Sequence, residues 1–531
     1  MAATLRPPVD PRSKGLNRRR FIQAGAIGAA GAAGLPLAAS AGDDGEQDGP
    51  INIVLVVIDT LRADHLACYG SPRARTPAFN ALAGRGITFS RAFPEAMATV
   101  PARRSIFSGT RTFPFRDWVV HPGLGGSPGW APLPDVSRAF TSVLRRNGYY
   151  TAQVSDNPHT TNGVYWEPFR DSFDRFITVP GRGGAVIPPE TVPEQVARQW
   201  LPPSMRDAHH VAVMRRFLAN HGRGKDERRT GAARVFSTAA EQLPRLARME
   251  KPFALVVDCF DPHEPWVPTR KYIDMYADPD YTGPEVGTLR YRHASSYLRP
   301  RDLRRMRTLY AATVSMVDHW LGRFLERLAE LELAGNTAVA VISDHGLLLG
   351  ERGWTGKVPS QLHPELAHVP LIVAHPAGKE AGAVVPRFAT TSDVGPTLLG
   401  MAGVSVPDWM TGSDLSPLFD GEQPADDRSF HYGGYFNRFW IRTDRWALFG
   451  ENRGIEFELY DLTLDRYERR NIARERPDVA EGLYARLLEA TDGPLPWFDA
   501  PPELRQLGYD TPPFRIDPVP GRPARRAPLT V

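Results

Sequence analysis

Five short apolar runs, rich in β-branched residues and each followed by polar residues, recur along the chain at 51–58, 149–154, 253–257, 337–342 and 369–374. Continuous apolar runs of this length are typical of strands that are buried on both faces of a sheet. Helix-like stretches at 136–146 and 301–333 precede two of the runs. Because strands that alternate with helices form parallel sheets, the pattern predicts an α/β fold with a large, mostly parallel central sheet flanked by helices.

The pattern changes after Asp420. Residues 436–448 and 456–462 read as short amphipathic strands, and residues 477–490 have the pattern of a final helix. We therefore expect a small C-terminal α+β subdomain with antiparallel strands. Residues 181–249 combine Pro-rich loops with a charged stretch, so we expect an insertion over the sheet's edge or the pocket rather than a part of the core.

The N-terminal residues have the features of an export signal. Residues 17–23 (NRRRFIQ) resemble the twin-arginine motif, and an Ala/Gly-rich apolar stretch and the small residues 39–41 (ASA) follow. We expect recognition by the twin-arginine export machinery, cleavage, and a periplasmic or extracellular location. A membrane anchor is the alternative, but the stretch is short and weakly apolar, so we expect no stable membrane span in the mature chain.

These features divide the chain into a signal peptide (1–41), a linker (42–50), a large domain (51–420, with the insertion at about 181–249), the C-terminal subdomain (428–495) and a Pro/Arg-rich tail (496–531). The signal holds six Lys or Arg and one Asp, so 58 bases and 59 acids remain after its removal. The net charge of the mature chain is then −1, and we expect no nucleic-acid partner. The two cysteines, Cys68 and Cys259, exclude a disulfide framework and leave a single bridge open.

The segment Thr99–Arg103 (TVPAR) places a hydroxyl at the start of a short helix. Pro101 suits the first helical turn, and two apolar residues before Gly109 indicate a buried helix that ends at the glycine. A helix N-terminus offers free N–H groups and a partial positive charge to a phosphate or sulfate, and Arg103 can add a charge-assisted contact. The alternative is that Thr99 only caps the helix.

Asp59, Asp344 and His345 each follow a predicted strand. Ligands of open parallel sheets bind at the carboxyl ends of the strands, where these side chains can converge on a divalent cation. Two carboxylates and an imidazole suit Zn or Mn better than Mg, and such a metal lowers the pKa of a hydroxyl nucleophile such as Thr99. The alternatives are a helix cap for Asp59 and a hydrogen-bonded turn for Asp344 and His345.

Seven segments in chain order resemble the sulfatase family of the alkaline phosphatase superfamily, namely 58–65, 76–80, 99–109, 261–266, 343–357, 368–372 and 396–399. The similarity extends to 458–462 and 471–473 and covers roughly residues 51–490. It implies an alkaline-phosphatase-like fold with a sulfatase-like catalytic domain at 51–420.

The resemblance also implies roles for the matched residues. The three metal candidates and Thr99 bind the cation, Thr99 attacks in line, and Arg103 holds the nucleophile and a non-bridging oxygen. His263 and Lys357 neutralise charge on the substrate, and one of them helps the leaving group depart. The alternatives are a structural histidine in a Pro-rich turn and a solvated loop lysine.

Four positions depart from the family pattern. Thr99 stands where the family has the Cys or Ser that is oxidised to formylglycine, and a secondary alcohol cannot give that aldehyde, so we expect no formylglycine. Thr60 replaces a second aspartate, which makes calcium a less favoured ion. His159 is out of register with the family's lysine and histidine, and His368 occupies the usual arginine place; both are candidates for substrate binding.

These residues favour an exported, metal-dependent hydrolase that cleaves phosphate mono- or diesters of a small molecule, glycan or lipid through Thr99. Its ligand set resembles that of the threonine-using phosphoethanolamine transferases and phosphodiesterases of the superfamily. Sulfuric ester hydrolysis is the alternative. A hydroxyl nucleophile disfavours it, because the sulfate adduct of a hydroxyl cannot be released by the hemiacetal collapse that formylglycine permits. Transfer of a phospho-head group and a non-catalytic glycan-binding role are less favoured. A second metal stays open, with ligands among Asp261, His263, His368 and His431.

Overall fold

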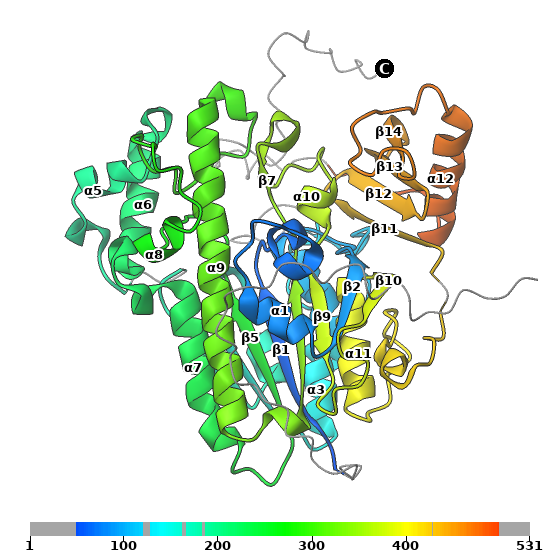
Figure 1. Ribbon diagram of the computed structural model, residues 1–531. Coiled ribbons are helices and arrows are strands. Elements are labelled where there is room, and N and C mark those ends of the chain that lie inside the picture. The colour runs from blue at the N-terminus through cyan, green and yellow to red at the C-terminus, as the bar shows by residue number, and fades with distance from the viewer. Residues whose placement is uncertain (1–48, 120–127, 162–165, 183–185, 427, 499–531) are drawn as a thin grey trace, which may run out of the picture. The chain divides into compact units, whose positions relative to one another are not determined.

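An eight-stranded sheet forms the centre of the computed structural model, with the strand order β10-β2-β9-β6-β1-β5-β3-β4 (Figure 1). Seven of these strands are parallel, and β9 runs antiparallel to both of its neighbours. The strands are β1 (Asn52–Ile58), β2 (Ile87–Ala92), β3 (Tyr150–Ser155), β4 (Arg175–Thr178), β5 (Phe253–Cys259), β6 (Thr337–Ser343), β9 (Leu371–Ala374) and β10 (Val384–Ala389). The predicted α/β class with a mostly parallel sheet is therefore confirmed.

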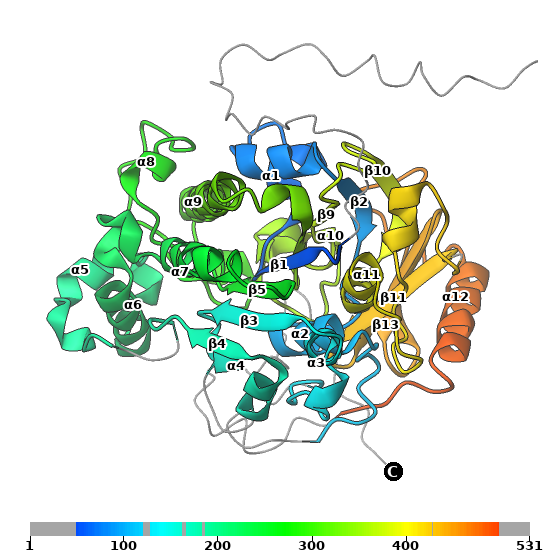
Figure 2. The ribbon, with the colours of Figure 1, turned by 90° about the horizontal axis from the view of Figure 1, so that it is seen from below.

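Helices cover both faces of this sheet, as Figure 2 shows. Along β1 the side chains alternate: Val54, Val56 and Ile58 pack in one apolar cluster, and Ile53, Leu55 and Val57 in another. The first cluster includes residues of α1 (Pro77–Ala83), α7 (Gly231–Leu246) and α9 (Pro300–Glu330), and the second includes residues of α2 (Thr99–Ser108), α3 (Phe140–Arg146) and α11 (Val394–Met401). The continuous apolar run of β1 thus reflects burial on both faces.

Shorter elements complete the large domain. They are α4 (Pro158–Thr161), α5 (Glu194–Gln199), α6 (Ala208–Asn220), α8 (Arg270–Ile273), α10 (Pro364–Ala367) and a two-stranded ribbon of β7 (Leu348–Leu349) and β8 (Thr355–Gly356).

A second, four-stranded antiparallel sheet follows in the C-terminal part. It consists of β11 (Phe430–Tyr435), β12 (Arg438–Thr443), β13 (Trp446–Glu451) and β14 (Ile455–Asp461), and α12 (Pro477–Ala490) packs against it (Figure 1). The predicted strand at 436–448 is in fact two strands with a turn between them. The predicted final helix at 477–490 has these same bounds in the structure.

Three sequence-based expectations need correction. The run at 369–374 forms β9, which is antiparallel to both β2 and β6, because an apolar run specifies burial but not strand direction. The helix expected at 136–146 begins as a short 3₁₀ turn, and α3 starts only at Phe140. Residues 181–249 were expected outside the core, but α7 packs on α9 and β5 and buries Val235, Phe236 and Leu243, because one face of this helix is apolar.

The structure describes residues 49–119, 128–161, 166–182, 186–426 and 428–498, which belong to one unit, Gln47–Val531. The expected signal peptide and most of the linker and of the tail lie outside the described residues. Among the residues described, no helix is long and apolar enough to cross a membrane. Cys68 and Cys259 are both free, so the single bridge left open by the sequence is not formed.

Candidate active site

Three adjacent strands bring acidic side chains to one edge of the central sheet. Asp59 directly follows β1, Asp258 lies at the end of the neighbouring β5, and Asp344 and His345 follow β6 on the other side of β1. The possible ligand atoms of Asp59, Asp344 and His345 all lie within 4.8 Å of one another, and all three residues are buried. The structure therefore brings together the three residues predicted to hold a metal.

Thr99 lies at this group as the first residue of α2, and Ala98 takes the N-cap position. Its Oγ1 is 3.3 Å from Nε2 of His345. Since Nδ1 of His345 lies 2.8 Å from the carbonyl oxygen of Gly346 and donates to it, the Nε2 lone pair faces Thr99 or a bound cation. Burial, assisted by the charge of Lys357, lowers the pKa of His345 to about 4, which keeps the ring neutral near pH 7.

Arg103 lies one turn further along α2 and contacts three buried carboxylates. Its Nη1 lies 2.5 Å from Asp344 and 3.2 Å from Asp59, and its Nη2 donates to Asp258 at 2.7 Å. These carboxylates raise the pKa of Arg103 against the opposing effect of burial. The guanidinium also donates to the Thr99 carbonyl at 3.3 Å, so Arg103 links the nucleophile candidate to the acidic group.

The charge balance of the group fits a divalent cation. Asp59, Asp258 and Asp344 supply three negative charges and Arg103 one positive charge, while His345 is neutral. Oδ2 of Asp59 accepts no hydrogen bond although it is fully buried, and burial raises the pKa of this carboxyl group. Its ion pair with Arg103 Nη1, at 3.2 Å, is shared with Asp344, and one arginine leaves two of the three negative charges uncompensated, so the residues present suit a bound cation with two positive charges.

Thr60 orients the two carboxylates. Its N–H donates to Asp344 at 2.9 Å and its hydroxyl donates to Asp59 at 2.5 Å. The backbone of Thr60 has φ +61°, a left-handed conformation that a β-branched residue rarely adopts. Strain of this kind is concentrated at functional sites. Thr60 thus acts as a hydrogen-bond donor to the ligands where the family pattern has a further acidic residue.

His263 and Lys357 form a contact pair. The ammonium group of Lys357 donates to Nε2 of His263 at 2.9 Å, and Nδ1 of His263 lies 2.8 Å from the Glu264 carbonyl. Burial lowers the pKa of His263 to about 4. Lys357 is buried and lies 4.0 Å from the Glu264 carboxylate, to which Tyr291 donates at 2.6 Å. The alternative of a solvated loop lysine is therefore wrong.

Arg182 fixes the turn that carries His263. Its Nη1 donates to the carbonyl of Glu264 and its Nη2 to that of His263, both at 3.1 Å, and Nη2 also pairs with Asp261. The guanidinium lies over the ring of Phe260, on which His263 stacks at a centroid distance of 4.3 Å. A residue of the 181–249 segment thus reaches the site, a contribution that no sequence motif indicated.

The two predicted substrate-binding histidines lie in different places. His159 packs edge-on against Trp130, and burial lowers its pKa to about 3 with help from the charges of His263, Arg103 and Lys357, so it lies within the electrostatic reach of the site. His368 instead lies 3.0 Å from the Ser90 carbonyl through Nε2 and lines a separate cavity. The structure does not bring His368 to the Asp59 group, because its imidazole is tied to β2.

Other candidates have different partners. His431 lies 3.1 Å from the Phe93 carbonyl, and Asp261 accepts from the N–H of Ala232 at 2.8 Å as well as from Arg182. In the part of the chain that the structure describes, Asp59, Asp344 and His345 form the one group of three acidic, His or Cys ligands, so the second metal left open by the sequence has no ligand cluster there.

The sequence marks Asp258 only as a polar residue at a strand end and assigns it no role, yet it accepts from both Nη2 and Nε of Arg103. Ser155 and Thr160 also donate to its Oδ2, at 3.0 and 3.4 Å. The signal available in the sequence was its place directly after an apolar run, which it shares with Asp59. The fold and this site together define an α/β enzyme with a carboxylate and histidine centre at the carboxyl edge of its sheet.

Comparisons with known proteins identify the family. The sulfatase family model matches residues 51–404, and the model of the N-sulphoglucosamine sulphohydrolase C-terminal region matches residues 350–492. An arylsulfatase of Clostridium perfringens is 26% identical over 483 residues, which cover 83% of this chain and 95% of that protein. A choline-sulfatase of Rhizobium meliloti is 26% identical over 450 residues, which cover 80% of this chain and 83% of that protein. The chain belongs to the sulfatase family and is a hydrolase of that family.

Solved structures share the fold. The phosphonate monoester hydrolase of Agrobacterium radiobacter superposes with a TM-score of 0.63 at 20% identity, covering 83% of this chain and 95% of that one. A protein in complex with its substrate D-glucosamine-2-N,6-O-disulfate superposes with a TM-score of 0.60 at 20% identity, and the match covers 84% of this chain and 98% of that one. Proteins of this fold thus include hydrolases of phosphonate esters and binders of sulfated sugars.

Proposed function

We propose that the protein hydrolyses phosphate mono- or diesters with the Thr99 hydroxyl as nucleophile. The observation that carries the proposal is the position of Thr99 Oγ1, 3.3 Å from His345 Nε2 at the Asp59 and Asp344 carboxylates. A phosphothreonine formed there can be hydrolysed by water, whereas a threonine sulfate lacks the hemiacetal route of formylglycine. The phosphonate monoester hydrolases among the structural neighbours support chemistry at phosphorus.

The same residues account for the chemistry of attack. Asp59, Asp344 and His345 would hold a divalent cation, for which we propose Zn or Mn, and this cation would supply a positive charge that lowers the pKa of the Thr99 hydroxyl. Thr60 holds both carboxylates in place through its N–H and hydroxyl. Arg103 fixes the start of α2 relative to these carboxylates and so sets the direction in which Thr99 presents its oxygen.

Lys357 is the better candidate for assisting the leaving group. His263 is neutral at pH 7, its Nδ1–H donates to a backbone carbonyl and its Nε2 accepts from Lys357, so it has no proton to give at the site. The ammonium group of Lys357 keeps two further N–H bonds for a substrate oxygen. The proton or positive charge that stabilises the departing alkoxide would therefore come from Lys357, which His263 orients.

Substrate comparison tests the proposal. Purified protein lacking residues 1–41 is assayed with an aryl phosphate, an aryl phosphodiester, an aryl phosphonate and an aryl sulfate, with metal content measured alongside. We expect the highest kcat/KM on a phosphorus ester and burst-phase trapping of phosphate on Thr99. If the aryl sulfate is turned over faster than every phosphorus ester, the proposal is wrong.

Sulfuric ester hydrolysis is a second candidate because the relatives identified by sequence, including the arylsulfatase and the choline-sulfatase, carry that activity in their names. It predicts turnover of the aryl sulfate without formylglycine at position 99, which mass spectrometry of the site peptide checks. We further propose export by the twin-arginine route to the periplasm or beyond, on the basis of residues 17–41.

A further inference from the structure

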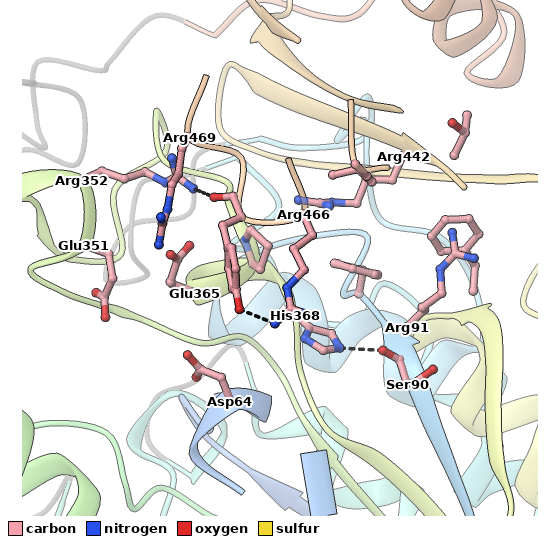
Figure 3. Close-up of a pocket in the computed structure, with 16 residues that line it drawn as sticks. Asp64, Ser90, Arg91, Glu351, Arg352, Glu365, His368, Arg442, Arg466 and Arg469 are labelled. Carbon is pink, nitrogen blue, oxygen red and sulfur yellow. Dashed lines mark hydrogen bonds between the residues drawn. The ribbon is translucent and has the colours of Figure 1, made fainter. Parts of the chain in front are cut away.

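A cavity separate from the catalytic residues lies between the central sheet and the C-terminal sheet (Figure 3). Its volume is about 780 Å³, and residues of β2, β12, the loop after β14 and the turn at 351–352 line it. None of the lining residues belongs to the Asp59, Thr99 and His345 group. His368 lies in the wall of this cavity.

Five arginines line the cavity: Arg91, Arg352, Arg442, Arg466 and Arg469. Arg91 pairs with Asp444 at 2.6 Å and Arg442 with Glu468 at 2.5 Å. Among the described residues, the other three contact no carboxylate through their guanidinium groups. Three arginines of the lining thus have no carboxylate partner among the described residues.

Tyr467 contacts all three of these arginines. Arg466 and Arg469 lie 4.5 and 5.0 Å from the centre of its ring, and Arg352 donates to its carbonyl at 3.1 Å. In Figure 3 the side chain of Arg466 extends down toward His368, with Arg352 and Arg469 to one side of it. All three arginines line the cavity, Arg466 and Arg469 from the loop after β14 and Arg352 from the turn at 351–352.

The acidic residues of the lining leave this charge in excess. Asp64 and Glu351 are both bound by Arg62, at 2.6 and 2.9 Å. Glu365 forms no ion pair within the described residues, so it offsets at most one of the three guanidinium groups that lack a carboxylate partner. The lining retains a net positive charge where an anion can enter.

Two of the lining arginines also have a buried N–H donor without an acceptor. Arg442 is only 4% exposed, and its Nε has no hydrogen-bond partner. Nε of Arg352 is likewise buried without a partner. Because a guanidinium offers five N–H donors in a fork that matches the oxygens of sulfate and phosphate, these unused donors suit a tetrahedral oxyanion.

We propose that this cavity binds a sulfate or phosphate group, held by Arg352, Arg466 and Arg469 and bordered by Arg442. The group is either a free inorganic anion or an ester on a sugar, since both present the same oxygens to the arginines. Binding here is independent of turnover at Thr99, so the site exists whether or not the proposed reaction is correct.

Equilibrium dialysis of the full mature chain with radiolabelled inorganic sulfate and phosphate tests the site. The variant Arg466→Gln/Arg469→Gln removes two of the holding groups, and Arg470→Gln is the matched control, because Arg470 lies on the same loop, pairs with Glu475 at 2.9 Å and does not line the cavity. The wild type and the control are expected to bind one equivalent more than the double variant, or to bind it at least about tenfold more tightly.

The catalytic site is unchanged in all three proteins, so its own anion binding cancels in the comparison. Equal stoichiometry and affinity in the double variant and the control would overturn the proposal. Competition then separates the two sources: displacement of the extra anion by glucosamine 6-sulfate at a lower concentration than by inorganic sulfate assigns a sugar ester, and the reverse order assigns a free anion. Thermal unfolding of each variant checks that the fold is intact.

Discussion

Replacing Arg103 by methionine removes one buried positive charge from three buried carboxylates. Arg103 lies 3.2, 2.7 and 2.5 Å from Asp59, Asp258 and Asp344, and its side chain is 0% exposed. Breaking a buried ion pair by removing one partner costs about 3–5 kcal/mol, because the remaining charge is desolvated and unpaired. With three carboxylates affected, Arg103→Met is expected to lower the free energy of unfolding by at least this amount at pH 7 in the presence of a chelator.

Arg104→Met is the matched control, one residue further along the same helix. Arg104 pairs with Asp117, whose side chain is 54% exposed and stays hydrated when the arginine is lost. A pair with one exposed partner contributes about 1 kcal/mol or less, so the control is expected to change the free energy of unfolding by no more than this. Urea titration followed by circular dichroism measures both variants.

The pH dependence of the free energy of unfolding distinguishes the loss of a charge from the loss of packing in Arg103→Met. Without Arg103, Asp59 has a folded pKa above its unfolded value, since burial already raises the pKa of this carboxyl group in the wild type and Arg103 is among the groups that lower it. The resulting destabilisation is fully present at high pH and disappears as pH falls through the raised pKa. The decrease in the free energy of unfolding caused by Arg103→Met is thus expected to be smaller at pH 5 than at pH 7. Equal losses in the two variants, or a deficit independent of pH, would refute the electrostatic account.

Four further outcomes are expected. Thr99→Ala lowers turnover of the best phosphorus ester by about 10³-fold or more, with metal content unchanged by atomic absorption. Asp344→Asn loses metal and activity together, because one anionic ligand is removed. His263 and His345 have pKa values of about 4 against an ordinary 6.5, so the unfolded chain binds more protons between these values and the free energy of unfolding falls as pH drops from 6.5 to 4. Arg182→Lys lowers kcat about tenfold with little change in KM, because the fork that holds the His263 turn is lost.

Each of these expectations has a contradictory result. Near-wild-type turnover in Thr99→Ala would show that Thr99 is not the nucleophile. Metal retained by Asp344→Asn would show that Asp344 is not a metal ligand. A free energy of unfolding that is constant between pH 6.5 and 4 would contradict buried neutral histidines. For Arg182→Lys, the control Arg198→Lys lies in the same segment with its side chain 43% exposed, and an equal loss of kcat in both would exclude a positioning role.

The local sequence predicted where several site residues lie, because these residues come directly after strands that the hydrophobic pattern predicts. Asp59 and Asp344 come directly after the apolar strands β1 and β6, and His345 follows Asp344, so the strand pattern places all three at one edge of the sheet. The turn at Gly109 was also predictable, since the helix ends there at φ +63°, a conformation that glycine adopts without strain. Thr99, by its chemistry alone, predicts that no formylglycine forms.

Contacts between distant residues were not predictable in this way. Arg103 and Asp258 are 155 positions apart, and Arg182 and His263 are 81 apart, so their meeting depends on how the strands and helices pack. His368 was assigned to the substrate by its place in a motif, whereas the packing of β9 against β2 ties it to Ser90.

The sequence by itself determined that the chain folds around a mostly parallel sheet, belongs with the sulfatases and carries a hydroxyl instead of an aldehyde precursor. The sheet follows from hydrophobic periodicity, the family from the resemblance of seven segments, and the hydroxyl from the identity of residue 99. Only the tertiary structure decided that β9 is antiparallel, that α7 is part of the core and that three carboxylates share one arginine. An apolar run specifies burial but not the direction of its partner strand, and a charge specifies no partner until packing brings one within reach.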